Sequence, residues 1–500
     1  MTRKSLRSLG IAFLILALTS VFYFFKGTSK PDYATLDGYY TQDISWSSCY
    51  GDFECAKFDV PIDYDNLSTG TFSIGTLRRV ADDTKHRIGS LIINPGGPGA
   101  SGIDYAYNAE YVFDPEITDR YDIVGFDPRG ITESEPIRCY TDKEADENFA
   151  ADAKPDSPQE FTEALKSTKD FIQKCIDKND HLTAFSTANA ARDMDILRAL
   201  VGDEKLNYMG KSYGTFLGTL YAQFFPDRIG RVVLDGAVDP AISRFEQTKM
   251  QAVSFDAALS AFIDYCLKDS LCPLPKDHAQ ATQFIIDLFV KTGKEPLPLK
   301  DSSSDRTLSE TLMVVGAASA LYDSENGWPS LENAIDDAIK GYADGFMELA
   351  DIYTGRQEDG SYPNNDLDSG AVIDCLDFAD NRSVDQIKKD AEKISLAAPV
   401  FGPYLGLGGL SCKFMPKNSP VVITTTTTTT PLLIIGTTND PATPYAWSVA
   451  LHTLLPNSHL LTYVGEGHTG QGRGNACIDD AVDKYYLQGV LPAENLRCTD

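Results

Sequence analysis

Short, nearly continuous apolar runs alternate with helix-like stretches along much of the chain, and this alternation limits the possible folds more than any other feature. Strands of a parallel sheet show such runs because helices cover both faces. The helix-like stretches include 188–200 and 215–225. The β-rich runs are 56–64, 71–80, 89–94, 122–127, 205–209, 231–235, 432–436 and 459–464. The sequence therefore predicts an α/β fold with a mostly parallel, doubly wound sheet.

The alternation stops between about residues 240 and 420. There, helical apolar spacing dominates in 248–267, 279–292, 309–321 and 331–352. We expect a helical cap inserted between two sheet strands, lying over the carboxyl edge of the sheet. The predicted division is a leader at 1–30, core at 31–240, cap at 241–420 and core again at 421–500. The seven threonines at 424–430 predict an exposed connector.

The chain carries a formal net charge of −28 over 500 residues. Such a surface repels phosphate backbones, so we expect no nucleic-acid partner. Basic residues precede an apolar run at 9–25, the plan of an export signal. Either a cleaved signal or an uncleaved membrane anchor fits this run, and both place the remaining residues on the extracytoplasmic side. Two sequons, at Asn66 and Asn381, would permit glycans there.

The chain has ten cysteines and no CxxC or Cys/His cluster typical of a metal site. In an exported chain, an even number of cysteines indicates disulfides. We predict that neighbours in the sequence pair, because each bond would then close a short loop within one region. The predicted pairs are Cys49–Cys55, Cys139–Cys175, Cys266–Cys272, Cys375–Cys412 and Cys477–Cys498.

Residues 210–214 read Gly-Lys-Ser-Tyr-Gly and fit the G-x-S-x-G nucleophile elbow. The pentapeptide alone is a weak signal, but an apolar run precedes it and a helix-like stretch follows it. Strand, sharp turn and helix are the context that an elbow requires, because the turn exposes the serine hydroxyl at the strand tip. Ser212 is therefore the predicted nucleophile.

A nucleophilic serine needs a base, and six histidines are available: His86, His181, His278, His452, His459 and His468. In this fold the chain order is serine, acid, histidine. His468 follows the strand-like run 459–464, in the position where catalytic groups gather in α/β sheets. Asp440 follows the run 432–436 and is the favoured acid. Asp235 and Asp239 compete with it, because some hydrolases place the acid after the preceding strand.

Residues 94–99 read Asn-Pro-Gly-Gly-Pro-Gly and follow another predicted strand. Glycines in such a loop let backbone N–H groups approach a substrate closely. The N–H of Gly97 or Gly96, together with that of Tyr213, is predicted to bind the oxyanion of a tetrahedral intermediate.

Four motifs together resemble the tripeptidyl aminopeptidases related to proline iminopeptidase. They are Asn-Pro-Gly-Gly-Pro-Gly-Ala-Ser-Gly at 94–102, Gly-Phe-Asp-Pro-Arg-Gly at 125–130, Gly-Lys-Ser-Tyr-Gly-Thr at 210–215 and Asp-Pro-Ala-Thr-Pro at 440–444. The resemblance covers about residues 46–498. It implies an α/β-hydrolase fold and a serine exopeptidase that releases short peptides from free amino termini, without metal or organic cofactor.

The resemblance also implies acidic groups in the cap that recognise the amino terminus, and Asp374 and Asp377 are the candidates. The chain departs from the family at 131–134, Ile-Thr-Glu-Ser, where relatives often have Gly-Arg-Ser, and in its threonine run. Two other functions fit the same residues. One is an esterase or lipase with the same triad, and the other is a non-catalytic binding protein on a hydrolase scaffold.

Overall fold

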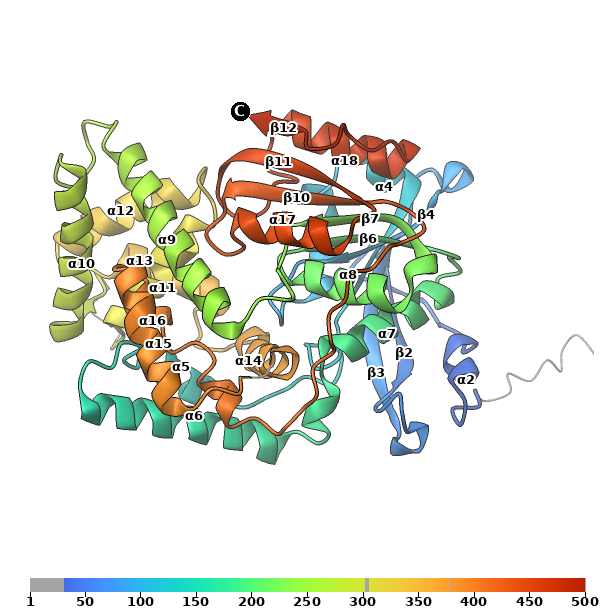
Figure 1. Cartoon of the computed structure of the whole chain (residues 1–500), viewed down its shortest axis with the longest axis horizontal. Helices are drawn as coiled ribbons and strands as arrows, with labels where there is room; N and C mark the ends of the chain where they lie inside the picture. Colours follow the sequence, from blue (N-terminus) through green and yellow to red (C-terminus); the bar gives the residue numbers. More distant parts are fainter. Residues whose placement is uncertain (1–30, 302–304, 379, 500) are drawn as a thin grey trace, which may run out of the picture.

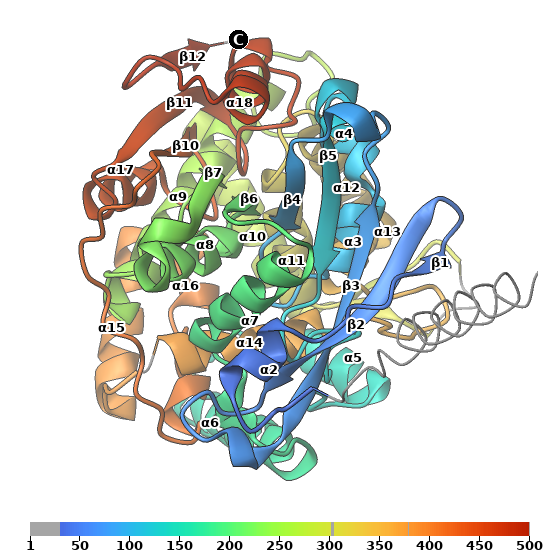
Figure 2. The same ribbon diagram turned by 90° about the vertical axis from the view of Figure 1, so that its right-hand side faces the viewer.

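A single twisted sheet forms the centre of the computed structural model, which describes residues 31–301, 305–378 and 380–499. Ten strands of this described part follow the order β1-β2-β3-β5-β4-β6-β7-β10-β11-β12. Figure 2 shows them from β1 on one side to β12 on the other. Their bounds are β1 Ser47–Cys49, β2 Phe53–Pro61, β3 Thr71–Arg79, β4 Gly89–Asn94, β5 Tyr121–Phe126, β6 Leu206–Lys211, β7 Ile229–Asp235, β10 Leu432–Asn439, β11 Ser458–Glu466 and β12 Arg497–Thr499.

The sheet is mostly parallel, as predicted. Strands β1, β2 and β3 pair antiparallel, and β3 also pairs antiparallel with β5. From β5 to β12 every pairing is parallel. Each predicted run overlaps a strand, because continuous apolar sequence belongs to strands that are buried on both faces.

Helices cover both faces of the sheet. One face carries α7 (Thr187–Leu200), α8 (Tyr213–Phe224) and α17 (Tyr445–Leu454), and the other carries α3 (Gly102–Tyr107), α4 (Pro115–Arg120) and α18 (Ala476–Gln488). The short helix α2 (Leu36–Tyr40) packs against α7 and β2. In β4, Ile92 points into one core while Leu91 and Ile93 point into the other. The two cores fix the sheet from both sides, so its carboxyl edge is a rigid platform.

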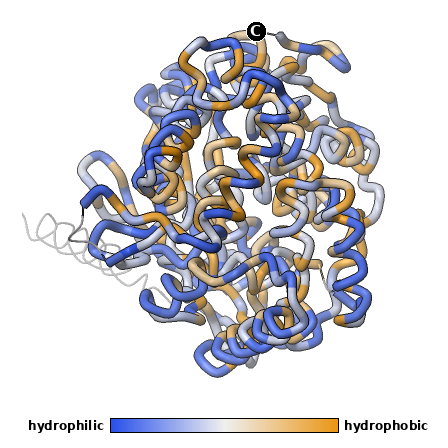
Figure 3. The backbone as a smooth tube through the Cα atoms, turned by 90° about the vertical axis from the view of Figure 1, so that its left-hand side faces the viewer, coloured by the Kyte–Doolittle hydropathy of each residue, from blue (hydrophilic) through white to orange (hydrophobic). Residues whose placement is uncertain are grey.

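A helical block lies beside this edge and has a hydrophobic core of its own (Figure 1). Its helices come between β7 and β10, and their bounds are α9 Arg244–Cys266, α10 His278–Lys294, α11 Glu310–Leu321, α12 Gly327–Ile339, α13 Asp344–Thr354, α15 Val384–Ala397 and α16 Gly402–Leu405. The helix α14 (Asp366–Asp377) lies in the same part of the chain but packs into the core beside the sheet. Figure 3 shows hydrophobic and hydrophilic stretches alternating along the chain on this side. The inserted helical cap is thus present, while the exact cap limits at 241 and 420 stay a prediction.

The predicted helical stretch 331–352 is wrong as a single element. It is divided between α12 and α13, which are separated by residues 340–343. Gly341 has a φ of 91°, a conformation that side chains other than glycine rarely adopt, and it ends the first helix. Helical spacing continues across the break because both helices face the same core.

A second helical segment, absent from the sequence prediction, follows β5. It consists of α5 (Asp142–Ala150) and α6 (Pro158–Lys178) and lies below the block in Figure 1. Lys154 pairs with Glu310 at 2.8 Å, and Arg356 pairs with Asp146 at 2.7 Å. These contacts join α5 and α6 to the block although they precede the nucleophile in the chain.

All five predicted cysteine pairs form disulfides. The threonine run is an irregular and mostly exposed connector before β10, as expected. In the described part of the chain, no helix is long and apolar enough to cross a membrane. The predicted export signal or anchor at 9–25 lies outside the described residues.

The loop after β5 is held by a buried ion pair. Arg129 is fully buried, and its guanidinium donates to both Asp193 oxygens at 2.7 and 2.6 Å. It also donates to the carbonyl oxygens of Pro61, Ile62 and Ala184. One side chain therefore joins the end of β2, the β5 loop and α7.

Arg129→Leu should lower the free energy of unfolding by about 3–5 kcal/mol, because it leaves the Asp193 carboxylate buried without its partner. Denaturant unfolding followed by circular dichroism measures this loss. As a control, Lys143→Ala removes the exposed Lys143–Glu147 pair and should leave the unfolding midpoint unchanged. Equal midpoints for the Arg129 and Lys143 variants would show that the buried pair contributes no stability.

Candidate active site

Ser212 lies at the sharp turn between β6 and α8, in the elbow that the sequence predicts. Its backbone has φ 54° and ψ −125°, which is a strained conformation for a residue with a side chain. The flanking glycines allow this turn. A Cβ on Gly210 would lie 2.4 Å from the Gly214 carbonyl oxygen, and one on Gly214 would lie 2.8 Å from Asn94 Oδ1. This packing fixes Ser212 at the carboxyl edge of the sheet.

His468 and Asp440 lie in the loops after β11 and β10 and contact each other directly. His468 Nδ1 is 2.9 Å from both carboxylate oxygens of Asp440. Asp440 is buried and also accepts hydrogen bonds from the backbone N–H groups of Ala442, Thr443 and Thr469. A carboxylate in this position orients the imidazole and stabilises its protonated form.

Thr443 is a further partner of this pair that the sequence reasoning did not identify. Its hydroxyl donates to Asp440 Oδ2 at 2.9 Å and lies 3.3 Å from His468 Nδ1. Thr443 belongs to the Asp-Pro-Ala-Thr-Pro motif at 440–444. Its position three residues after Asp440 is the sequence feature from which this contact could have been predicted.

The two competing aspartates have other roles. Asp239 accepts a hydrogen bond from the Ala241 N–H. The buried carboxylate of Asp235 accepts from the backbone N–H groups of Gly470 and Gln471, both 2.9 Å away. Burial raises the pKa of Asp235 above its ordinary value. Of the three candidate acids, Asp440 is the one whose carboxylate contacts His468 Nδ1.

Asp235 brings the nucleophile and histidine loops together. Its carbonyl oxygen accepts the Ser212 N–H at 2.8 Å, while its side chain holds the loop that follows His468. The next residue, Gly236, lies against the imidazole, because a Cβ placed there would be 3.4 Å from His468 Cε1. Lys211, within the elbow, donates to the Gln471 carbonyl oxygen at 2.7 Å. The elbow and the histidine loop are therefore adjacent and joined by a hydrogen bond.

The glycine loop after β4 lies beside the elbow. Gly96 and Gly97 have φ values of 111° and 107°, which explains why both are glycine. A Cβ on Gly96 would lie 2.8 Å from Ser212 Cβ and 3.3 Å from the Tyr213 nitrogen. The Gly96 N–H already donates to Asn94 Oδ1. The N–H groups of Gly97 and Tyr213 are therefore the better pair of candidate oxyanion donors.

The helical block contacts His468, the candidate base, and no sequence signal indicated this contact. The His468 N–H donates to the Tyr322 carbonyl oxygen at 2.9 Å, and the Tyr322 ring meets the imidazole edge-on at 5.1 Å. Arg473 donates to the carbonyl oxygens of both residues at 3.0 Å. The end of α11 thus helps to hold the proposed base in place.

The two candidate cap carboxylates differ in their surroundings. Asp374 pairs with Arg244 at 2.9 Å. Asp377 accepts hydrogen bonds from the Thr187 backbone N–H and hydroxyl, and the same hydroxyl contacts the Tyr213 hydroxyl. Burial, together with nearby Asp374, raises the pKa of Asp377 to about 7. Among the residues that the structure describes, Asp377 forms no ion pair, and Thr187 connects it to Tyr213, the residue after Ser212.

Among the described residues, Asp374, Cys375 and Cys412 lie close enough together to hold a metal ion. The two sulfurs form a disulfide with each other, so they offer no thiolate ligands. The arrangement around Ser212 suits acyl transfer instead, with a nucleophile, an oriented base and backbone donors on one edge of the sheet.

Asp440→Asn should lower kcat for hydrolysis of a p-nitrophenyl ester by about 10⁴-fold, because the imidazole loses the carboxylate that fixes its tautomer. Asp239→Asn is the matched control and should change kcat less than about threefold, since that carboxylate only accepts a backbone N–H. Steady-state kinetics on both folded variants measure the difference. If Asp239→Asn were the inactive variant, the triad assignment would be wrong.

Comparisons with known proteins identify the family of this chain. Residues 89–474 match the family model described as alpha/beta hydrolase fold. The serine protease Hip1 of Mycobacterium tuberculosis strain H37Rv is 34% identical over 91% of both chains. Carboxylesterase B of the same strain is 34% identical over 91% of this chain and 89% of its own. The tripeptidyl aminopeptidase of Streptomyces lividans is 28% identical over 91% and 86%. The chain belongs to the α/β-hydrolase family, and its relatives confirm the resemblance to serine peptidases of that fold.

Proposed function

We propose that the protein is an exported serine exopeptidase that releases short peptides, tripeptides among them, from free amino termini. The observation that carries this proposal is the His468–Asp440 pair, held beside the Ser212 elbow by Asp235. The relatives named serine protease and tripeptidyl aminopeptidase support a peptide substrate. The five disulfides support folding outside the cytoplasm.

In the proposed reaction, His468 removes the Ser212 proton as the hydroxyl oxygen attacks the peptide carbonyl carbon. The Gly97 and Tyr213 N–H groups hold the resulting oxyanion, and Asp440 stabilises the imidazolium. His468 then donates its proton to the leaving amine as the C–N bond breaks, which leaves an acyl-serine ester. Water then attacks this ester as His468 takes its proton, the bond between the acyl carbon and Ser212 Oγ breaks, and His468 returns the proton to Ser212 Oγ as the acyl half leaves as an acid.

Asp377 is the proposed anchor for the substrate ammonium group. It lines a cavity of about 380 Å³ together with Phe216 and Leu220 of α8, the helix that begins at the nucleophile. Among the described residues no cation pairs directly with this carboxylate, because nearby Arg244 pairs with Asp374. An ammonium group would supply a positive charge to pair with the Asp377 carboxylate.

A carboxylesterase is the second candidate, because Carboxylesterase B is as similar in sequence as Hip1. Both functions use the same triad, so the triad does not separate them. Recognition of a free amino group does separate them, because an ester substrate needs no ammonium anchor.

A tripeptide amide with a free amino group should be hydrolysed with a kcat/KM at least about 100-fold above that of its N-acetylated form, since acetylation removes the charge. Chromatography of the products measures both rates. Ser212→Ala should abolish turnover and fluorophosphonate labelling while the protein stays folded. Equal rates for the free and acetylated peptides would favour the esterase. Fluorophosphonate labelling of the Ser212→Ala variant would show that Ser212 is not the nucleophile.

Asp377→Asn should raise KM for the free tripeptide amide about tenfold and leave ester hydrolysis unchanged, because it removes the ammonium partner. In the unaltered protein, KM should rise as the pH falls below about 7, where the Asp377 carboxylate becomes protonated. The substituted protein should lose this part of the pH dependence. An unchanged KM in the Asp377 variant would assign ammonium binding elsewhere.

A further inference from the structure

A buried hydrogen-bond chain begins at Tyr213, whose backbone N–H is one of the two proposed oxyanion donors. The Tyr213 hydroxyl contacts the Thr187 hydroxyl, which in turn donates to Asp377 Oδ2. The Thr187 backbone N–H donates to the other carboxylate oxygen at 2.9 Å. Thr187 is fully buried and Tyr213 is only 6% exposed, so these contacts are shielded from solvent. The chain joins the proposed ammonium anchor to the residue after Ser212.

The hydrogen-bond chain has one direction while Asp377 is ionised. A carboxylate can only accept, so the Thr187 hydroxyl donates its single proton to it. The Thr187 oxygen must then accept from the Tyr213 hydroxyl. Burial and the nearby Asp377 charge raise the pKa of Tyr213 well above its usual range, so this hydroxyl keeps the proton that it donates. Each bond in such a chain polarises the next one.

Protonation of Asp377 removes this fixed direction, because a neutral carboxyl group has a proton of its own to donate. Burial raises the pKa of Asp377 to about 7, so both forms are populated near neutral pH. A bound ammonium group favours the ionised form, since opposite charges attract. Ammonium binding would thereby hold Thr187 as the donor to Asp377 and Tyr213 as the donor to Thr187.

The helix α14 fixes Asp377 relative to the loop that carries the other proposed oxyanion donor. Asp377 is the last residue of this helix, and the start of the helix packs on the glycine loop. A Cβ on Gly99 would lie 2.3 Å from the Asp366 carbonyl oxygen, and one on Gly370 would lie 2.5 Å from the Pro98 carbonyl oxygen. Backbones packed this closely have little freedom to move independently. An ammonium group on Asp377 is thus held in a fixed place beside both donors.

We propose that Thr187 is a positioning residue that transmits ammonium binding at Asp377 to Tyr213, so that a free amino group raises kcat as well as affinity. This inference rests on the proposed role of Asp377 as the ammonium anchor. Ordering of the Tyr213 side chain holds its backbone N–H where the oxyanion forms. The ammonium group then stabilises the transition state more than it stabilises the bound substrate.

Steady-state kinetics on a tripeptide p-nitrophenyl ester and its N-acetylated form test the proposal in the unaltered protein. Unlike a simple p-nitrophenyl ester, the free form carries an ammonium group. We expect its kcat to exceed that of the acetylated form about tenfold, in addition to a lower KM. Equal kcat values would overturn the proposal, and a lower KM for the free form would in that case still support the ammonium anchor.

The ester pair also separates this inference from the proposed function. An esterase hydrolyses both forms, so the kcat ratio can be measured without cleavage of a peptide bond. A failure to hydrolyse tripeptide amides would therefore reject the exopeptidase and leave the ratio of the two esters as a test of Thr187.

Two substitutions at position 187 separate positioning from stability. Thr187→Val keeps the shape and the backbone N–H but removes the hydroxyl, and it should reduce the kcat ratio of free to acetylated ester from about ten to about one, roughly the effect of one hydrogen bond. Thr187→Ser keeps the hydroxyl and should retain the ratio. A loss of stability would slow both esters alike and leave the ratio unchanged. An unchanged ratio in Thr187→Val would overturn the proposal.

A double-substitution cycle tests whether the two hydroxyls act as one chain. Tyr213→Phe removes the other hydroxyl and leaves the backbone N–H in place, so it should lower the ratio as Thr187→Val does. The double variant should have no larger effect than either single variant. Tyr111→Phe, at a tyrosine that is 88% exposed, is the matched control and should leave the ratio unchanged. A full ratio in Tyr213→Phe, or additive effects of the two substitutions, would contradict the chain.

Discussion

The buried carboxylate of Asp235 is the constraint on which the proposed chemistry depends. It lies at the end of β7, between β6, which leads to Ser212, and β10 and β11, which lead to Asp440 and His468. Its backbone carbonyl holds Ser212, and its side chain holds Gly470 and Gln471. A serine and a histidine that are 256 positions apart in the sequence are thus connected through one residue. Keeping this carboxylate buried raises its pKa, and the two backbone donors and Lys211 offset that cost.

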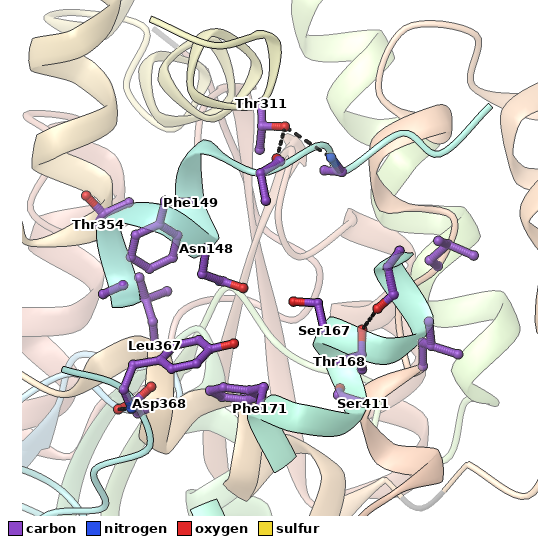
Figure 4. Close-up of a pocket in the computed structure, with 18 of the residues that line it drawn as sticks. Asn148, Phe149, Ser167, Thr168, Phe171, Thr311, Thr354, Leu367, Asp368 and Ser411 are labelled. Atoms are coloured by element: carbon purple, nitrogen blue, oxygen red, sulfur yellow. Dashed lines mark hydrogen bonds between the residues drawn. The ribbon is translucent and has the colours of Figure 1, made fainter. Parts of the chain in front are cut away.

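The helical block is part of the same arrangement. Tyr322 and Arg473 connect the end of α11 to His468 through backbone carbonyl oxygens. A movement of the block would therefore change the position of His468, the proposed base. The segment α5–α6 also packs on the block, and a cavity of about 650 Å³ lies between them (Figure 4). The position of His468 and the packing of the helical block are consequently connected.

Much of the fold was predictable because its signals are local. Continuous apolar runs identified β4 and β10, and the glycines around Ser212 identified the elbow. The order of serine, acid and histidine then selected Asp440 and His468, which the structure brings into contact. Pairing of neighbouring cysteines succeeded because each bond lies within one region of the chain.

The parts that sequence reasoning missed depend on contacts between distant segments. Nothing near α5 indicates that it pairs with the helical block, because Asp146 and Arg356 are 210 positions apart. Tyr322 acts through its carbonyl oxygen and its ring edge, and neither leaves a pattern in the sequence. Asp235 was considered only as a rival acid, since a carboxylate that accepts backbone N–H groups looks like any other aspartate in a sequence. The single stretch at 331–352 failed for a local reason, the positive φ at Gly341.

A crystal structure of the protein after reaction with a fluorophosphonate tests the central claim most directly. We expect phosphorus on Ser212 Oγ, the phosphonyl oxygen within hydrogen-bonding distance of the Gly97 and Tyr213 nitrogens, and His468 Nε2 facing Ser212 Oγ. Asp235 should hold Gly470 and Gln471 as it does here. An adduct on another residue, or a phosphonyl oxygen pointing away from both nitrogens with His468 out of reach of Ser212, would contradict it.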